Sequence, residues 1–251
     1  MTTALITGAT SGIGLSIARQ LAGHGHDLVL VARDAERLAQ VADEITLQFG
    51  RECEVLPADL ADLDQSREVE ARLADDTRPV EWLVANAGFG IREPFDASTV
   101  EAEQAMIDIL VSSPMRLAHA ALPGMLSRGR GRILIVSSVA SFAPMGTYSA
   151  AKVWATCFAE SLQMKYGAAG VHTTALCPGY TRTEFHERAD MDVDSLPDYL
   201  WLDADAVAAA GIKACEAGKA MSIPGAIYKG VYGLTEIVPR SVKRIIVGRM
   251  Q

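Results

Sequence analysis

The sequence predicts an α/β fold in which parallel strands alternate with helices along the chain. Short apolar stretches are separated by longer segments whose apolar residues recur every three or four positions, as on one face of a helix. Two of the apolar stretches, residues 28–31 and 133–136, contain no polar residue, which is typical of strands buried on both faces of a parallel sheet. With 251 residues, 49% of them hydrophobic, the chain can bury a sizeable core and is within the range of one large α/β domain.

The expected elements follow one another without an internal repeat, a low-complexity stretch or a linker. Apolar runs predict strands at residues 4–7, 27–32, 54–57, 82–85, 132–137, 171–177 and 221–224, and helical periodicity predicts helices at 13–23, 34–48, 62–75, 99–127, 148–169 and 204–217. Leu15, Ala18 and Leu21 give the first helix its apolar face, and Asp34 can cap the second helix. We therefore expect residues 1–251 to form a single doubly wound domain, with a central, mostly parallel seven-stranded sheet flanked by helices.

A glycine-rich turn joins the first strand to the first helix. Gly8, Gly12 and Gly14 stand between them, so the backbone can approach a pyrophosphate while the positive N-terminal end of the helix faces it. The spacing is Gly-x-x-x-Gly-x-Gly and differs from the Gly-x-Gly-x-x-Gly form. The turn predicts a dinucleotide site in a Rossmann-type fold, where ligands bind at the carboxyl ends of the strands.

Tyr148 and Lys152 stand four residues apart, which in a helix places a phenol and an ammonium on one face. The ordinary pKa of tyrosine, about 10, is too high for easy proton exchange near neutral pH, and a neighbouring cation favours the phenolate. Tyr148 is therefore predicted to be an acid/base group. The alternative is a chance pairing of two surface side chains.

Five segments in order make the chain resemble the short-chain dehydrogenase/reductase superfamily over nearly its whole length. They are residues 7–14 (TGATSGIG), residues 86–88 (NAG), Ser138, the pair Tyr148 and Lys152, and residues 177–183 (CPGYTRT). The resemblance implies that Ser138 hydrogen-bonds the substrate oxygen, Tyr148 exchanges the proton, and Lys152 holds the nicotinamide ribose and lowers the pKa of Tyr148. Ser137 should point to the opposite face, because neighbouring strand residues alternate.

The resemblance also implies which residues bind the cofactor. Besides Tyr148 and Lys152, these are Gly8, Thr10, Ser11, Gly12, Ile13, Gly14, Arg33, Asp59, Leu60, Asn86, Ala87, Gly88, Pro178, Gly179, Thr181 and Thr183. Asp59 is expected beside the adenine, with a helix N-cap as its alternative role. Residues 86–88 are expected to line the adenosine-side ribose and to support the sheet.

The end of the second strand indicates which nicotinamide cofactor binds. An acidic residue there usually binds the ribose 2′-hydroxyl of NAD, whereas an arginine accommodates the 2′-phosphate of NADP. Here Ala32 occupies the acidic position and Arg33 follows it, which favours NADP(H), with NAD(H) still possible. Arg37 could add charge. Alternatively, Arg33 and Arg37 are solvated charges, and Asp34 only caps the next helix.

One position departs from the family pattern. The family commonly carries an asparagine in the long fourth helix, where it supports a water linked to the active-site lysine, but this chain has Leu110. Asp108 and Ser112 lie on other faces of a regular helix, although Pro114 could distort it. Either backbone carbonyls alone hold the water, or another group has taken over, or the proton relay is impaired.

Composition limits the other classes of function. The net charge of −8 argues against nucleic acid as a partner, since phosphate binding needs a basic face. No apolar run approaches the roughly 20 residues of a membrane span, and the first strand begins too early for a signal peptide, so we expect a cytoplasmic protein. The basic segment 240–249 could touch a membrane surface, but we favour packing on the core or on a neighbouring subunit. The four cysteines are far apart, and we expect no metal site.

These features predict an NADP(H)-dependent oxidoreductase that interconverts a secondary alcohol and a ketone. Residues 89–92, residues 140–146 and a lid at about 184–203 should line the substrate pocket, whose aromatic side chains suggest an apolar or aromatic carbonyl compound. Two alternatives are an NADP(H)-binding sensor or scaffold module with weakened catalysis, and an NAD-linked alcohol dehydrogenase. The resemblance and the small residues of helices 99–127 and 148–169 imply a homodimer or homotetramer.

Overall fold

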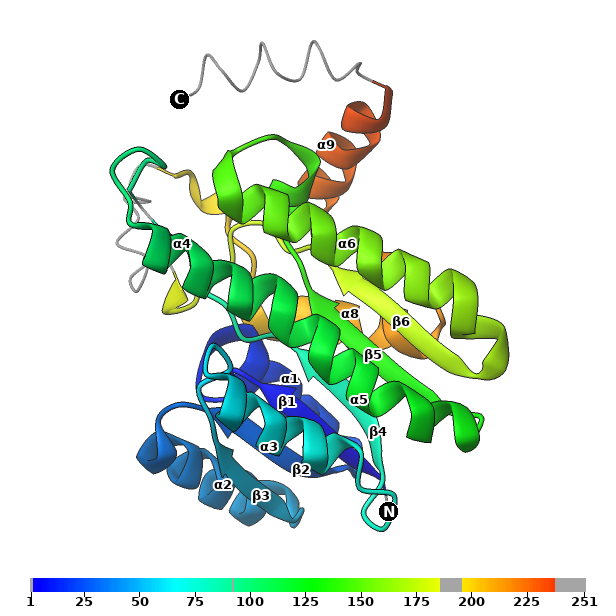
Figure 1. The fold of residues 1–251 in the computed structure, drawn as a ribbon. Helices are drawn as coiled ribbons and strands as arrows, with labels where there is room; N and C mark the ends of the chain where they lie inside the picture. The colour runs from blue at the N-terminus through cyan, green and yellow to red at the C-terminus, as the bar shows by residue number, and fades with distance from the viewer. Residues whose placement is uncertain (1, 92, 186–195, 238–251) are drawn as a thin grey trace.

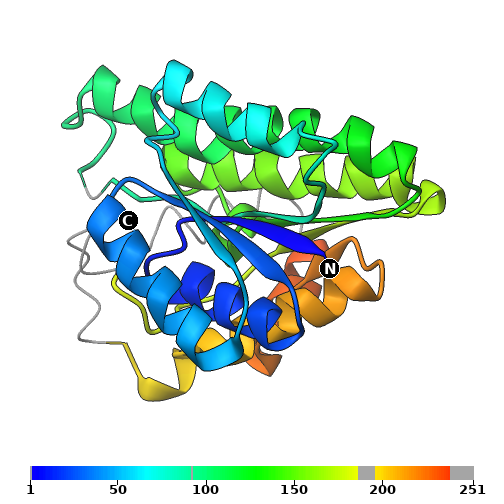
Figure 2. The same ribbon diagram turned by 90° about the horizontal axis from the view of Figure 1, so that it is seen from below.

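In the computed structural model, the chain folds around one seven-stranded sheet with helices on both faces (Figures 1 and 2). The structure describes residues 2–91, 93–185 and 196–237. The strands are β1 (Thr3–Thr7), β2 (Asp27–Ala32), β3 (Cys53–Pro57), β4 (Val80–Ala85), β5 (Gly131–Val136), β6 (Val171–Leu176) and β7 (Met221–Ser222). They pair in the order β3-β2-β1-β4-β5-β6-β7, and each pairing is parallel. The predicted doubly wound α/β sheet is confirmed.

The helices form one layer on each face of the sheet. They are α1 (Gly12–Gly23), α2 (Ala35–Phe49), α3 (Leu63–Leu73), α4 (Val100–Ile107), α5 (Ser113–Ser127), α6 (Gly146–Tyr166), α8 (Ala204–Glu216) and α9 (Ala226–Ile237). Figure 2 shows α3, α4, α5 and α6 on one face and α1, α2 and α8 on the other. The carboxyl ends of β1 and β4, neighbours at the centre of the sheet, therefore open between the two layers.

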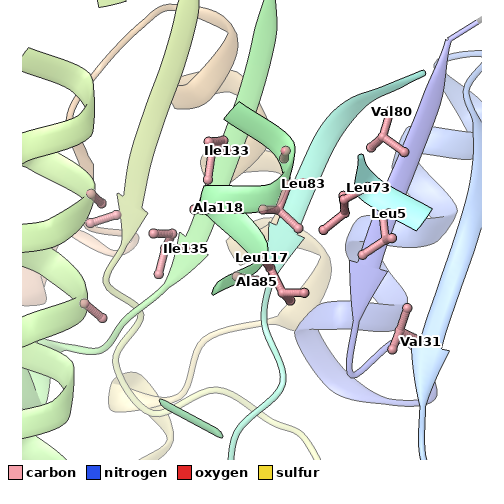
Figure 3. Packing of buried hydrophobic residues seen from close by; sticks show 14 of the residues in the cluster. Leu5, Val31, Leu73, Val80, Leu83, Ala85, Leu117, Ala118, Ile133 and Ile135 are labelled. Carbon is pink, nitrogen blue, oxygen red and sulfur yellow. The ribbon is translucent and has the colours of Figure 1, made fainter. Parts of the chain in front are cut away.

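Strand alternation divides the core between the two layers. Leu5 of β1 packs with Leu83 and Ile133 under α3, α5 and α6, as Figure 3 shows, whereas its neighbour Ile6 packs with Val84 on the side of α1, α2 and α8. All five side chains are fully buried. The continuous apolar runs of the sequence are explained by this burial on both faces.

Aspartate and threonine side chains cap the N-termini of several helices. Asp34 accepts a hydrogen bond from the Arg37 amide at 3.0 Å and so caps α2, which confirms its expected structural role. The cap of α3 is Asp62, which accepts from the amides of Asp64 and Gln65. The alternative N-cap role of Asp59 is therefore wrong.

The structure differs from the predicted elements in three places. The expected helix at 99–127 is interrupted by a π-helical turn at Asp108–Ser112, directly before Pro114. The seventh strand has only two residues. Helix α9 was not expected, because its sequence contains Gly230 and Gly233, which weaken helix propensity.

Several expectations fall outside the described residues. They concern Arg92, most of the expected lid (186–195) and the basic segment 240–249. Within the described part of the chain, no helix is long and apolar enough to cross a lipid bilayer.

Candidate active site

The glycine turn has the backbone shape that the sequence predicts. Gly8 and Gly12 have φ values of +65° and +55°, in the left-handed region that favours glycine. A Cβ atom on Gly14 would lie 2.2 Å from the carbonyl oxygen of Gly8, so a side chain at this position would collide with the turn. Because α1 begins at Gly12, the positive end of its helix dipole faces this turn. The turn fits the pyrophosphate of a dinucleotide.

Asn86 joins the glycine turn to the end of β4. Its side-chain amide donates to the carbonyl oxygens of Thr7 at 2.9 Å and Gly8 at 3.2 Å. In return, the Thr7 hydroxyl accepts from the backbone amides of Asn86 at 2.9 Å and Ala87 at 3.0 Å. Asn86 therefore links the carboxyl ends of β1 and β4 and supports the sheet there, as expected.

The side chains of Ser137 and Ser138, which follow β5, have different neighbours. Ser137 is buried, and its hydroxyl donates to the carbonyl oxygen of Lys152 at 2.9 Å and lies 2.7 Å from the Thr156 hydroxyl. Ser138 is partly exposed, receives a hydrogen bond from the Ala140 amide at 3.1 Å, and has a hydroxyl that hydrogen-bonds Tyr148. Of the two serines, only Ser138 therefore lies beside the phenol.

The pKa of Tyr148 is raised to about 12, because burial disfavours the phenolate more than the hydrogen bond from Ser138 favours it. The expected lowering of this pKa by Lys152 is therefore wrong for this structure, although the ammonium lies 5.6 Å from the ring centroid. A phenol with this pKa is protonated at neutral pH. It can donate a proton, and it needs a higher pH to accept one.

Lys152 is buried one helical turn beyond Tyr148, as the four-residue spacing predicts. Its ammonium donates to the carbonyl oxygen of Val136 at 2.8 Å. Burial lowers the pKa of Lys152 to about 8. The side chain is thus still mostly charged at neutral pH, and two of its three N–H donors can serve a ligand or a water.

The segment after β6 closes against the glycine turn. A Cβ atom on Gly12 would lie 3.0 Å from Thr183, and the Val139 amide donates to the carbonyl oxygen of Pro178 at 3.0 Å. Thr181 is buried, and its hydroxyl donates to the carbonyl oxygen of Gly179 at 3.0 Å. The structure thus brings the segment containing Pro178, Gly179 and Thr181 close to both the glycine turn and Ser138.

Tyr228 of α9 is a positioning residue that the sequence reasoning missed. Its hydroxyl accepts from the Tyr180 amide at 3.1 Å and donates to the carbonyl oxygen of Leu200 at 2.7 Å. A Cβ atom on Gly179 would lie 2.0 Å from the Tyr228 ring, so the glycine is required by this packing. The available signal, an isolated tyrosine in a glycine-rich segment, was too weak to indicate this contact.

The family model described as short chain dehydrogenase matches residues 2–194, which is more than half of the chain. The chain belongs to the short-chain dehydrogenase/reductase family. Members of this family are oxidoreductases that act on CH–OH groups with a nicotinamide cofactor.

Two known proteins are similar in sequence to this short-chain dehydrogenase/reductase. The very-long-chain 3-oxoacyl-CoA reductase of Anas platyrhynchos is 34% identical over 188 residues, which cover 72% of this chain but only 60% of that protein. The oxidoreductase UcpA of Salmonella typhimurium strain LT2 is 35% identical over 189 residues, which cover 74% of this chain and 71% of UcpA.

Two solved structures match almost the whole chain. A short-chain dehydrogenase from Sphingobium yanoikuyae in complex with NADPH has a TM-score of 0.85 and 33% identity, and the match covers 95% of this chain and 96% of that one. The bulky-bulky ketone specific alcohol dehydrogenase from Comamonas testosteroni has a TM-score of 0.81 and 29% identity, with 96% of each chain covered.

In this short-chain dehydrogenase/reductase, the residues expected on the adenosine side follow β2 and β3. Arg33 is exposed at the end of β2, and Arg37 forms an ion pair with Glu184. Asp59 accepts from the Ala61 amide at 3.0 Å, which shapes the turn after β3. The remaining expected cofactor residues Thr10, Ser11, Ile13, Leu60, Ala87 and Gly88 all lie in the turns after β1, β3 and β4 or at the start of α1.

The expected substrate side is rich in aromatic rings. The Phe185 ring lies 6.2 Å from the Tyr148 ring, and Phe142 packs on Tyr232 of α9 at 4.7 Å between ring centroids. Trp201 packs on Tyr180 at 5.9 Å. Tyr199 and Met145, in contrast, are mostly exposed. Among the described residues, no group of three or more histidine, cysteine, aspartate or glutamate side chains could hold a metal ion.

Proposed function

We propose that this enzyme interconverts a secondary alcohol and a ketone with NADP(H) as the preferred cofactor. The observation that carries the proposal is the placement of Ser138, Tyr148 and Lys152 next to a glycine turn at the carboxyl edge of the sheet. The NADPH complex of the Sphingobium relative and the ketone specificity in the name of the Comamonas relative support it.

The residues of the cleft fit a nicotinamide dinucleotide. The glycine turn and the N-terminus of α1 hold the pyrophosphate, and Lys152 holds the nicotinamide ribose with the donors that Val136 does not use. Pro178, Gly179, Thr181 and Thr183 border the nicotinamide. When bound, the cofactor supplies the hydride for ketone reduction or accepts it from the alcohol.

Two side chains of the protein, those of Ser138 and Tyr148, bind the substrate oxygen and transfer its proton. Ser138 hydrogen-bonds the substrate oxygen and orients it toward the phenol. Tyr148 donates its proton to that oxygen as negative charge develops there, which a pKa of about 12 allows at neutral pH. In the oxidative direction Tyr148 has to be deprotonated, which the burial of the phenol disfavours at neutral pH.

The preference for NADP(H) rests on the end of β2. Ala32 offers no carboxylate to a ribose 2′-hydroxyl, and the exposed Arg33 guanidinium pairs with a 2′-phosphate. The apolar and aromatic side chains around Tyr148, among them Phe89 and Phe185, favour an apolar or aromatic carbonyl compound as substrate. We further propose that residues 1–251 form one domain, that 184–203 cover the substrate, and that the four unpaired cysteines reflect a cytoplasmic location.

Leu110 favours a second candidate, an NADP(H)-binding sensor or scaffold module, because leucine cannot make the hydrogen bond of the family's asparagine. A screen of purified protein with NADPH or NADH against ketones and aldehydes separates the two. Oxidation of NADPH by a ketone, lost in Tyr148→Phe, supports the enzyme. Tight NADPH binding without turnover of any compound would favour the module.

A further inference from the structure

We infer that Glu184 is a specificity-determining residue, whose ion pair with Arg37 makes the position of Phe185 beside Tyr148 depend on the 2′-phosphate of the cofactor. The inference rests on the proposed function, because it requires NADP(H) as the cofactor. Its consequence is that a ketone binds more tightly beside NADPH than beside NADH.

Thr183 holds the start of the segment that contains Glu184 and Phe185. A Cβ atom on Gly12 would lie 3.0 Å from the Thr183 side chain, so this threonine lies directly against the glycine turn. The Thr183 hydroxyl also accepts a hydrogen bond from the Phe185 amide at 3.3 Å. Thr183 therefore anchors the segment, and the next two residues extend from this anchor to different parts of the site.

Glu184 extends to the residues expected near the 2′-phosphate. Its two carboxylate oxygens accept hydrogen bonds from the two terminal nitrogens of Arg37, at 3.2 Å and 2.5 Å. Arg37 and Thr10 of the glycine turn line the same surface groove. The guanidinium that Glu184 binds thus lies close to the turn that fits the pyrophosphate.

A 2′-phosphate and the Glu184 carboxylate compete for the same guanidinium. The phosphate carries more negative charge and more acceptor oxygens, and arginine can bind it with two parallel hydrogen bonds. Both side chains of the ion pair are more than a third exposed, so breaking it costs little. When Arg37 binds the phosphate, Glu184 loses this partner and is repelled by the added negative charge. NADH has no 2′-phosphate and leaves the ion pair intact.

Phe185 transmits this change to the catalytic phenol. It follows Glu184 directly in the chain, and its ring lies 6.2 Å from the Tyr148 ring. Tyr148 also packs in an apolar cluster that includes Phe89, and the burial that raises its pKa leaves little room beside the phenol. A shift of Glu184 displaces the Phe185 ring and gives a carbonyl compound space next to Tyr148.

Fluorine NMR tests this coupling without turnover, with Phe185 replaced by 4-fluorophenylalanine. The protein is titrated with adenosine 2′,5′-bisphosphate, which has the 2′-phosphate but no nicotinamide, and with adenosine 5′-monophosphate, which lacks the 2′-phosphate. We expect the fluorine resonance to shift with the bisphosphate alone. In Glu184→Gln the resonance should stand near the shifted position before any nucleotide is added. Glu44→Gln is the matched control, because Glu44 forms an exposed ion pair with Arg19, and it should behave as the wild type.

Steady-state kinetics test the effect on the substrate. An exposed ion pair corresponds to a factor of at most about five, so the KM for a ketone should be about two- to fivefold lower with saturating NADPH than with saturating NADH. In Glu184→Gln the KM measured with NADH should fall to the value measured with NADPH. In Glu44→Gln the difference between the two cofactors should persist.

The outcomes separate this inference from the proposed function. If calorimetry shows that the bisphosphate binds but the fluorine resonance does not move, the inference is overturned and the proposed function stands. An equal shift with adenosine 5′-monophosphate, or a wild-type response in Glu184→Gln, overturns it in the same way. If the bisphosphate binds no more tightly than adenosine 5′-monophosphate, the preference for NADP(H) fails and the inference fails with it.

Discussion

Arg37 at the start of α2 forms an ion pair with Glu184, which lies 147 positions further along the chain. Their atoms approach to 3.2 Å between Nη1 and Oε2 and to 2.5 Å between Nη2 and Oε1. Both side chains are more than a third exposed, so the pair contributes at most about 1 kcal/mol. The ion pair links Arg37, on the expected adenosine side, to Glu184. The next residue, Phe185, has its ring near that of Tyr148. A 2′-phosphate that binds Arg37 has to compete with Glu184.

The first prediction concerns that competition. Glu184→Gln should tighten NADPH binding roughly two- to fivefold, because it frees Arg37 for the phosphate at a cost below about 1 kcal/mol. NADH lacks the phosphate, so its affinity should stay the same. Titration of both cofactors measures this, with Glu101→Gln on the exposed face of α4 as the control for the change in net charge. Equal tightening of NADH would mean that Glu184 acts on something other than the 2′-phosphate.

Arg33 tests the cofactor preference itself. A hydrogen bond to a charged group contributes roughly 1.5–3 kcal/mol, so wild type should bind NADPH about ten- to a hundredfold more tightly than NADH. Arg33→Ala should remove most of this difference by weakening NADPH binding alone. Calorimetric titrations of the two proteins with both cofactors check the prediction, and it is contradicted by equal affinities in the wild type.

Tyr148→Phe tests the proton donor. The ring can still pack, so the melting temperature and NADPH affinity should be close to those of the wild type. The turnover rate should fall by a factor on the order of 10²–10⁴, the usual contribution of a positioned acid. A residual rate within a few-fold of the wild type would assign the proton to another group.

The buried lysine predicts a pH dependence of stability. The pKa of Lys152 is about 8 in the folded protein and near its ordinary value of 10.5 when unfolded, so the unfolded chain binds more protons between these pH values. The contribution of Lys152 to the free energy of unfolding should therefore rise from pH 8 to pH 10. Lys152→Met should lack this rise in urea titrations, whereas the exposed Lys213→Met should retain it. Parallel curves for all three proteins would mean that the lysine is not desolvated.

The oligomeric state can be tested by substitutions on the helices α4, α5 and α6. They expose large apolar side chains, namely Val100, Met115, Val153 and Met164, which is consistent with a further subunit covering this face. We expect a dimer or tetramer by light scattering at micromolar concentration. Val153→Arg should shift the mass toward monomer, and Leu47→Arg, at the more exposed Leu47 of α2 on the other side of the sheet, should not. A wild type that is monomeric under these conditions contradicts the proposal.

The sequence by itself determined the order of strands and helices, the glycine turn and the pairing of Tyr148 with Lys152. These features depend on interactions within a few residues. Apolar periodicity decides whether a segment is a helix or a strand, a left-handed backbone requires glycine, and four-residue spacing places two side chains on one helix face. Strand alternation likewise sufficed to separate Ser137 from Ser138.

The tertiary structure alone decided what depends on distant neighbours. Arg37 meets Glu184, and Tyr228 meets Gly179, across gaps in the chain that no local pattern spans. The direction of the Tyr148 pKa shift follows from how completely other elements exclude water from the phenol. The π-helical turn before Pro114 places Ser113 on the wall of a small cavity beside Lys152, because one added residue per turn rotates every later side chain to a new face.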